Sequence, residues 1–290
     1  MTKSPVPSVA HSEPSLCVLA QQYGYAKVVK SPKQSMGLAM FAGAFIALAF
    51  VFYITVTTGA GDAPWGLVRL AGGLAFSLGL MLVVICGAEL FTSTVLSTLS
   101  FAEKRVTASQ LLGCWARVFF GNFIGASMML VLVLMAGMYQ LDHGQWGLNA
   151  LSIAQHKIHH GWWQAFALGV LCNMLVCLGV WMTFASRDPL TRAVLLMLPV
   201  AMFVSSGFEH SIANLFMVPL GIAIAEFAPV SFFQNLGIHA ADYHDLTLVN
   251  FILNNLIPVT LGNIVGGGVI VGLGYWLIEQ ASAESKQQGQ

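Results

Sequence analysis

The chain has few charged residues. Asp, Glu, Lys and Arg together make up 8% of its 290 residues, whereas a soluble domain has roughly 25%. Hydrophobic residues make up 57%, and the 12 basic residues balance the 12 acidic ones. Without an excess of positive charge there is no sign of a nucleic-acid partner. The composition therefore predicts an integral membrane protein that binds no nucleic acid.

Sequence signals of redox, metal and cofactor chemistry are also missing. The five cysteines contain no Cys-x-x-Cys pair, and Glu209-His210 lacks the HExxH spacing of zinc proteases. The run 156–160 holds three histidines, which could bind a transition metal but equally fits a polar loop entering a helix. The first 35 residues are largely polar and lack the apolar core of a cleavable signal peptide. We expect no enzyme activity, no cofactor and no metal.

Long apolar runs, in contrast, are abundant. A membrane crossing needs about 20 residues, and hydropathy predicts six segments, of which the second and fifth are too long for one straight helix. Their approximate bounds are 37–58, 68–99, 109–138, 161–185, 192–226 and 248–278. We expect residues 1–35 to be a cytoplasmic segment with an amphipathic helix from Pro14 to Lys30, whose apolar side carries Leu16, Leu19, Ala20 and Tyr23. Residues 36–279 would be the six-span domain, and 280–290 a disordered cytoplasmic tail.

The basic residues predict an orientation. Most of them fall on one side of the six-span arrangement, which places both termini in the cytoplasm. Arg69, at the mouth of the second segment, and Lys157 fall on the opposite side. Arg117 lies inside the third segment, so we expect it to reach the cytoplasmic surface or to meet a neighbouring protomer.

Two polar stretches interrupt the apolar segments. Gly87-Ala88-Glu89 lies in the second segment, and the same Gly-x-Glu triplet recurs as Gly207-Phe208-Glu209 in the fifth. A charge at the centre of a bilayer costs from about 2.5 to more than 10 kcal/mol. Two interruptions at matching places therefore predict a pathway across the membrane.

The repetition extends to the third and sixth segments. Gly121-Asn122 with Gly125 is echoed by Gly262-Asn263 with Gly266. Because each half would contain three crossings, the halves must run in opposite directions, a recurring transporter design with broken helices at the repeat interface. Small residues four apart would let neighbouring helices approach closely. The fold class predicted is an all-α membrane protein with an inverted 3+3 repeat.

The breaks place polar groups at the membrane centre. Each restarting half-helix would point a partially positive N-terminus there, which suits a small anion. Thr92 and Ser93 offer hydroxyl donors from one break, and His210 offers an imidazole from the other. Histidine is the side chain that titrates near neutral pH, so His210 could attract or protonate a weak acid.

Structural roles compete with these functional ones. Thr92 and Ser93 could merely bond backbone carbonyls of the broken segment. Glu89 and Glu209 are better explained as acceptors for loop N–H groups. Asn173 fits either a bond between helices or a pore lining. The apolar residues around the breaks fit ordinary packing or hydrophobic constrictions; they are Phe76, Leu80, Leu90, Phe91, Phe203 and Phe208.

Several motifs together resemble the formate/nitrite transporter family, over residues 15 to 278. They are Phe91-Thr-Ser-Thr-Val95, Gly121-Asn122, Gly144-Gln-Trp-Gly-Leu-Asn149, His156-Lys157, Cys177-Leu-Gly-Val-Trp-Met182, Leu198-Pro-Val-Ala-Met-Phe203, Ser206-Gly-Phe-Glu-His-Ser-Ile-Ala-Asn214 and Asn255-Leu-Ile-Pro-Val-Thr-Leu-Gly-Asn263. The resemblance implies an aquaporin-like fold and a homopentamer in membrane lipid with one pore per protomer. It implies that Thr92 and His210 face a central site. Phe76 and Phe203 resemble the periplasmic constriction, and Leu80 and Leu90 the cytoplasmic one. Lys157, Asn173, Glu209 and Asn263 resemble positions that support the site or raise its positive potential.

The function that follows is passage of formate, a small monovalent weak-acid anion, in both directions, with His210 coupling uptake to a proton. A channel for nitrite or hydrosulfide is the alternative within the family. A neutral-solute channel like aquaporin is disfavoured because paired Asn-Pro-Ala boxes are absent. The family resemblance also suggests that the N-terminal segment touches a cytoplasmic formate-producing enzyme.

Overall fold

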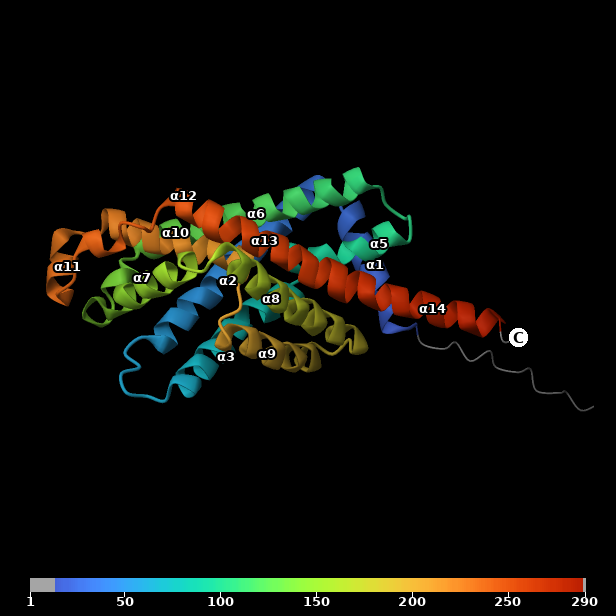
Figure 1. Ribbon diagram of the computed structural model, residues 1–290, viewed down its shortest axis with the longest axis horizontal. Helices are drawn as coiled ribbons and strands as arrows, with labels where there is room; N and C mark the ends of the chain where they lie inside the picture. The colour runs from blue at the N-terminus through green and yellow to red at the C-terminus, as the bar shows by residue number, and fades with distance from the viewer. Residues whose placement is uncertain (1–13, 289–290) are drawn as a thin grey trace, which may run out of the picture.

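The computed structural model describes residues 14–288, and these form helices and turns without a strand. The expectations for residues 1–13 and 289–290 therefore lie outside the described residues. The helices form an elongated bundle, with α1 (Leu16–Val29) and α5 (Thr98–Ala102) toward one end and α7 (Gln145–Ile158) and α11 (Val230–Leu236) at the other (Figure 1). We call these ends the α1 side and the α7 side.

Long apolar helices form the body of the bundle. Five stretches are each long and apolar enough to cross a membrane alone: α2 (Pro32–Thr57), α3 (Trp65–Ile85), α6 (Ala108–Met135), α8 (Trp162–Met182) with its 3-10 extension to Ala185, and a last stretch within Ala240–Ser282. That stretch contains α12 (Leu248–Asn250), a π-helical segment Phe251–Leu256, α13 (Ile257–Asn263), a second π-helical segment Ile264–Leu273, and α14 (Gly274–Gln288). The remaining crossing is made of two shorter helices in tandem, α9 (Pro189–Ser205) and α10 (Ser211–Phe227). The six predicted segments are confirmed.

The second and fifth segments are both broken, as predicted, and the breaks have the same backbone. After α3, Gly87 has φ +72°, and after α9, Gly207 has φ +74°. The next residue then bonds back across the helix end, from Ala88 N–H to the Val83 carbonyl (2.8 Å) and from Phe208 N–H to the Phe203 carbonyl (2.9 Å). This is the Schellman ending, which requires a left-handed residue that glycine supplies without steric cost. The Gly-x-Glu repeat is thus a repeated helix stop.

The chain restarts as a helix after each break. α4 (Phe91–Thr94) begins after the first and continues through a 3-10 turn, Val95–Ser97, into α5. α10 begins after the second. Each half of the chain therefore has the same order: a short helix, a long helix, a broken helix and another long helix. Three crossings per half invert the second half relative to the first, which agrees with the predicted repeat.

Glycines let the outer helices of each half approach closely. A Cβ added to Gly125 of α6 would lie 1.8 Å from the Met40 carbonyl oxygen of α2. In the other half, a Cβ on Gly266 would lie 2.1 Å from the Val170 carbonyl oxygen of α8. Both distances are impossible for a larger residue, so the predicted small-residue packing holds in each half.

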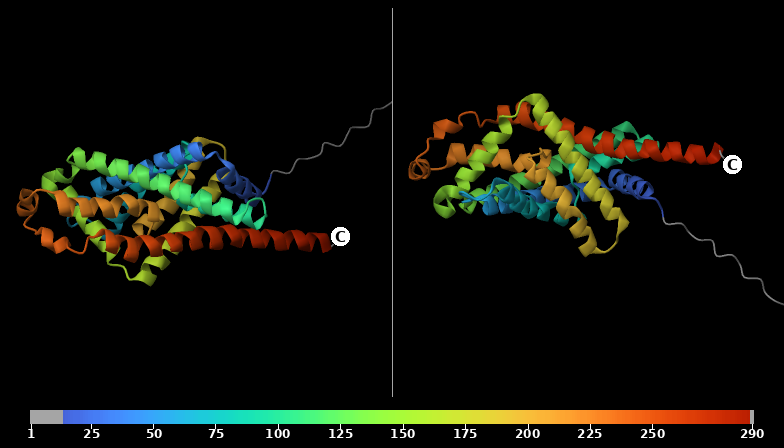
Figure 2. Two further views of the ribbon diagram at one scale, coloured as in Figure 1. Left: turned by 90° about the horizontal axis from the view of Figure 1, so that it is seen from above. Right: turned by 60° about the horizontal axis from the view of Figure 1, so that its bottom comes forward.

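The structure corrects the sequence analysis at both ends of the chain. The side of α1 that is buried carries Cys17, Ala20, Gly24 and Lys27, whereas Leu16 is 38% exposed. Of the predicted apolar side, Ala20 is buried and Leu19 and Tyr23 are half-buried, so the departures from the prediction are the exposure of Leu16 and the burial of Lys27. At the other end, α14 is helical to Gln288 and extends past the bundle (Figure 2), whereas a disordered tail was predicted from residue 280. Its Ala, Glu, Gln and Lys residues are good helix formers.

Two helices on the α7 side were not predicted. Residues 139–160 lie between two predicted segments, and residues 145–158 of this stretch form α7, the counterpart of α1 in the second half. After α10 the chain turns by 101° into α11. With 14 residues, several of them polar, α7 is too short and too polar to resemble a membrane crossing.

Candidate functional site

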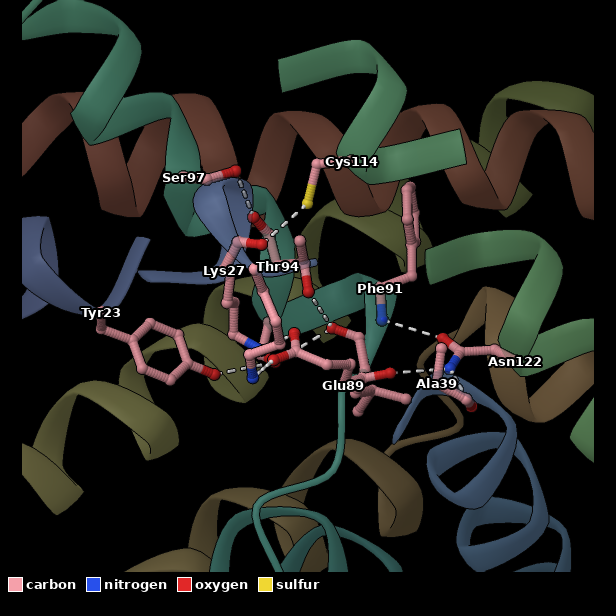
Figure 3. A network of polar contacts seen from close by, with 12 residues as sticks. Tyr23, Lys27, Ala39, Glu89, Phe91, Thr94, Ser97, Cys114 and Asn122 are labelled. Carbon is pink, nitrogen blue, oxygen red and sulfur yellow. Dashed lines mark hydrogen bonds and ion pairs between the residues drawn. The ribbon is translucent and has the colours of Figure 1, made fainter. Parts of the chain in front are cut away.

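The first break is held by a buried ion pair. Glu89 is 2% exposed, and its carboxylate contacts the ammonium groups of Lys27 (2.7 Å) and Lys30. Lys27 comes from α1 and is itself 4% exposed (Figure 3). A buried carboxylate is tolerated when a cation and hydrogen bonds compensate for the lost hydration. The contacts of Lys27 and Lys30 with Glu89 therefore hold α1 against the first break.

The second break has a matching pair. Glu209, also 2% exposed, contacts the Lys157 ammonium of α7 at 2.8 Å. Its other carboxylate oxygen accepts hydrogen bonds from the side-chain amides of Asn214 (2.6 Å) and Asn255 (3.1 Å). Both glutamates were expected to accept loop N–H groups. That interpretation was wrong, because the Glu89 carboxylate contacts lysine ammonium groups and the Glu209 carboxylate contacts a lysine and two asparagine amides.

Two asparagines bind the backbone that the breaks leave unpaired. Asn122 accepts the Phe91 N–H (2.9 Å) and donates to the carbonyls of Glu89 (2.8 Å) and Ala39 (2.7 Å) (Figure 3). Asn263 likewise accepts an N–H, that of Ser211 at 2.9 Å. It donates to the carbonyls of Glu209 (3.0 Å) and Gly169 (2.8 Å). Unpaired backbone groups at membrane depth need such partners. Asn122, to which no role was given, therefore makes the same set of bonds as Asn263.

The two breaks meet at Thr92 and His210. The Thr92 Oγ1 and His210 Nε2 atoms are 3.0 Å apart, and the two residues are 0% and 3% exposed. His210 is also the N-cap of α10, since its Nδ1 accepts the Ala213 N–H at 3.1 Å. A neutral imidazole whose Nδ1 accepts carries its proton on Nε2. His210 therefore donates to Thr92 Oγ1, and the Thr92 hydroxyl proton is free for another acceptor.

Apolar side chains lie around this pair. The rings of Phe76 and Phe203 are 6.1 Å apart at 81°, and Phe203 stacks on the His210 imidazole at 6.0 Å and 15°. Leu80 and Leu90, which are 3% and 0% exposed, come from α3 and from the residue before α4. Phe76 and Phe203 are thus buried on the His210 side of the pair, Leu90 directly precedes the first restart, and Leu80 is buried within α3.

A cavity reaches each break. On the α7 side, a cavity of about 380 Å³ extends from Trp65 and Arg69 to Phe76, Phe203 and His210. On the α1 side, another of about 380 Å³ is lined by Lys27, Lys30, Glu89 and Arg192. Both cavities contain more basic than acidic side chains, which favours anions over cations.

The structure separates the other predicted residues by role. The Ser93 hydroxyl donates to the Leu90 carbonyl (3.0 Å) and accepts from Tyr23 (3.1 Å), so it bonds the broken segment and α1. Asn173 donates to the carbonyls of Thr92 (3.0 Å) and Asn263 (2.6 Å), which joins α8 to both halves. Ser93 and Asn173 therefore bond neighbouring helical segments, whereas the Thr92 hydroxyl is bonded to His210.

Some residues of the site were not found from the sequence. Lys27 and Lys30 were counted only as surface charges, although the pairing of Lys157 with the second Gly-x-Glu could have suggested an equivalent lysine for the first. Arg117 is half-buried in α6, and its Nε has no hydrogen-bond partner among residues 14–288. The structure gives no further account of it.

An inverted repeat with two broken helices, whose restarting ends converge on a buried hydroxyl and imidazole between two cavities, defines a membrane transport protein. The chain belongs to the formate/nitrite transporter family, whose model matches residues 15–277. It is 50% identical over 264 residues to the formate channel FocA of Escherichia coli strain K12, covering 91% of this chain and 93% of that protein. It is 47% identical over 247 residues to FocA of Haemophilus influenzae, covering 85% and 87%.

Solved structures agree with this family. A pentameric formate channel with formate bound has 54% sequence identity and a TM-score of 0.81, covering 86% of this chain and 98% of that one. An FNT family ion channel with 26% identity has a TM-score of 0.76, covering 91% and 98%. The predicted family and helical membrane fold are confirmed, and the family is one of transporters rather than enzymes.

Proposed function

We propose that this protein conducts formate and similar small anions of weak acids in both directions across the bacterial inner membrane, as a homopentamer with one pore in each protomer. The observation that carries the proposal is the buried Thr92–His210 pair, 3.0 Å across, at the meeting point of the two breaks. The names of the similar proteins, which are formate channels, support formate as the solute. The pentamer is taken from the similar solved structure.

The pair offsets the desolvation of the anion. A carboxylate that leaves water for an apolar constriction loses several kcal/mol or more unless it is hydrogen-bonded. The Ala213 N–H, the imidazole of His210 and the Thr92 hydroxyl form one chain in which each group donates to the next. Such chains polarise their members, and the Thr92 O–H at the end is directed to the anion.

Proton coupling would use the same chain in another state. To convert formate to formic acid, Thr92 gives its hydroxyl proton to a formate oxygen and receives the Nε2 proton of His210. The imidazole must therefore begin protonated on both nitrogens and end neutral. Protonation of Nδ1 removes its lone pair from the Ala213 N–H, so the proton-coupled state requires the N-cap bond of α10 to open. Anion passage leaves that bond intact.

Competition measures which anion the pore prefers. Proteoliposomes loaded with buffer would be given labelled formate together with unlabelled formate, nitrite or hydrosulfide across a range of pH. We expect formate to compete best, and Thr92→Ala to slow formate at every pH. Stronger competition by nitrite or hydrosulfide would reassign the pore to that anion. Water or glycerol flux without anion flux would overturn the proposal.

The α1 side is proposed to be cytoplasmic, with both termini there, and α1 is proposed as the segment that a formate-producing enzyme contacts. α1 lies against the first break through Lys27 and through Tyr23, whose hydroxyl bonds Ser93 at 3.1 Å. A protein that binds α1 could therefore alter the cavity behind it. Deletion of residues 1–30 should change formate flux in cells, and unaltered flux would remove this partner.

A further inference from the structure

Arg69 lies at the mouth of the α7-side cavity and is held there from three directions. Its Nε donates to the Ser205 carbonyl at the end of α9 (2.9 Å), and its Nη1 donates to the Tyr53 hydroxyl of α2 (3.4 Å). The guanidinium also lies 5.6 Å from the Trp65 ring. These contacts fix the plane of the guanidinium, so its remaining donors have set directions.

The second break leaves room for this side chain. A Cβ on Gly207 would lie 2.9 Å from Arg69 Nη2, so the guanidinium occupies the space above that glycine. A Cβ on Gly87, the equivalent glycine, would meet no atom within 4 Å in the described part of the chain. The guanidinium therefore distinguishes the two breaks, although their backbones match.

The charge of Arg69 has no acidic partner in the described part of the chain. Among residues 14–288, no acidic side chain forms an ion pair with it, whereas Lys157 in the same cavity is paired with Glu209. A guanidinium has five N–H donors, and two are used by Ser205 and Tyr53. Three donors and a full positive charge are left at the entrance of the cavity that ends at Phe76, Phe203 and His210.

We propose that Arg69 is a binding residue for the permeating anion in the α7-side cavity, before the phenylalanine pair, and that it favours planar anions with two oxygens. A guanidinium matches the two oxygens of a carboxylate or of nitrite with parallel hydrogen bonds, and this geometry adds specificity as well as affinity. Hydrosulfide has one acceptor atom and gains only the charge. This inference rests on the proposed function and names a further site and its selectivity.

Two substitutions of Arg69 separate the effect of its charge on anion binding from the effect of its forked hydrogen-bond geometry. Arg69→Lys keeps the charge and loses the fork, whereas Arg69→Gln loses both. Right-side-out and inside-out vesicles from cells would present labelled formate or hydrosulfide to one face at a time. We expect Arg69→Gln to raise the half-saturating formate concentration about tenfold at the α7 face, as for the loss of a charged hydrogen bond. Arg69→Lys should raise it for formate while leaving hydrosulfide nearly unchanged.

Controls keep the outcome clear. Arg187→Gln removes an exposed arginine from the loop before α9, on the α1 side, and should leave entry at the α7 face unaltered. Pentamer size and thermal unfolding would verify that each variant is folded. An unchanged half-saturating concentration in both Arg69 variants, or an equal change at the two faces, would overturn the proposal. If the unmodified protein carried no formate, the proposed function would fail instead, before any variant was compared.

Discussion

The two broken segments share a backbone and differ in the side chains they present. Each has a left-handed glycine, a Schellman ending, a buried glutamate paired with lysine, and an asparagine that binds the restarting helix. At the position before the restart, the first break has Leu90 without a side-chain cap, and the second has His210, which caps α10. Two residues later the order reverses, with polar Thr92 in the first and apolar Ile212 in the second.

This difference shows how a symmetric frame produces an asymmetric site. The repeated backbone brings the two restarts together, and the exchange of polar and apolar residues leaves one hydroxyl facing one imidazole. If both breaks carried histidine before the restart, two titratable rings would lie close together. If both carried leucine there, no imidazole would be present to donate to Thr92. One polar residue from each half gives a single short hydrogen-bond chain through otherwise apolar surroundings.

The largest effect on formate uptake is expected when the polar residue before the second restart is replaced by an apolar one. His210→Phe keeps a ring against Phe203 but removes the cap of α10 and the donor to Thr92. We expect formate uptake driven by an inward proton gradient to fall to the level of protein-free liposomes. The control His244→Phe changes an exposed loop histidine and should retain uptake. Uptake with unchanged pH dependence in His210→Phe would exclude a proton role for this residue.

Removing each glutamate compares the two ion pairs. Glu209→Gln leaves Lys157 buried without its carboxylate, and breaking a buried pair in this way costs about 3–5 kcal/mol. Glu89→Gln should cost less, because the Lys30 side chain is 22% exposed and only Glu209 also accepts hydrogen bonds from two buried asparagine amides, Asn214 and Asn255. Thermal unfolding of both purified variants in one detergent would measure the difference. A larger loss for Glu89→Gln would contradict this ranking.

Alanine at each left-handed glycine would isolate the contribution of Arg69. A non-glycine residue in this conformation costs about 1–2 kcal/mol, and Gly87→Ala should show that cost alone. Gly207→Ala adds a clash with Arg69 and should displace the guanidinium. We therefore expect a greater loss of thermal stability in Gly207→Ala, together with weaker formate entry from the α7 face. Equal stability and equal entry in both variants would show that the contact is unimportant.

The smallest effect on stability is expected at the first residues of α3 and α9, the helices that precede the two breaks. α3 starts after Pro64 without a side-chain cap, whereas Asp188 caps α9 by accepting the Thr191 N–H at 2.7 Å. This bond, and one from the Thr191 hydroxyl, hold the pKa of Asp188 below its ordinary value of 3.8. A carboxyl with a lowered native pKa stabilises the fold above its unfolded pKa, and this contribution is lost as the pH falls through the native value.

Asp188→Ala should therefore lower the melting temperature slightly at pH 7, and the gap between the variant and the unmodified protein should close below pH 3.8. Pro64→Ala, at the uncapped equivalent, provides the matched control and should show no such dependence on pH. A gap that stays constant down to acid pH would mean that the Asp188 carboxylate is not what stabilises the start of α9.

The sequence predicted the crossings and breaks well because these depend on nearby residues. Apolar length defines a membrane helix, and Gly87 and Gly207 end their helices through their own backbone conformation. The repeated Gly-x-Glu triplet predicted both breaks, and the family resemblance implied that Thr92 and His210 face the same site. Their bounds differ from the structure by only a few residues, except at the C-terminal end.

Contacts between distant segments were predicted poorly. Lys27 reaches Glu89 across 62 residues, and neither the charge count nor the apolar side assigned to α1 indicated that it would be buried. Thr92 and Ser93 are adjacent and chemically alike, yet only the rotation of α4 decides which one faces His210. The direction in which Arg69 lies over Gly207 depends in the same way on how α3 packs against α9.

The sequence by itself thus determined that the protein is a six-span inverted repeat of the formate/nitrite transporter family, with two glycine-ended breaks. These features arise from local hydropathy, local backbone preference and recognisable motifs. Only the tertiary structure decided that each glutamate is paired with a lysine from a short helix, that Thr92 bonds His210, and that Arg69, at one entrance, forms no ion pair within residues 14–288. Those choices depend on the packing and rotation of helices far apart in the chain, which no local pattern encodes.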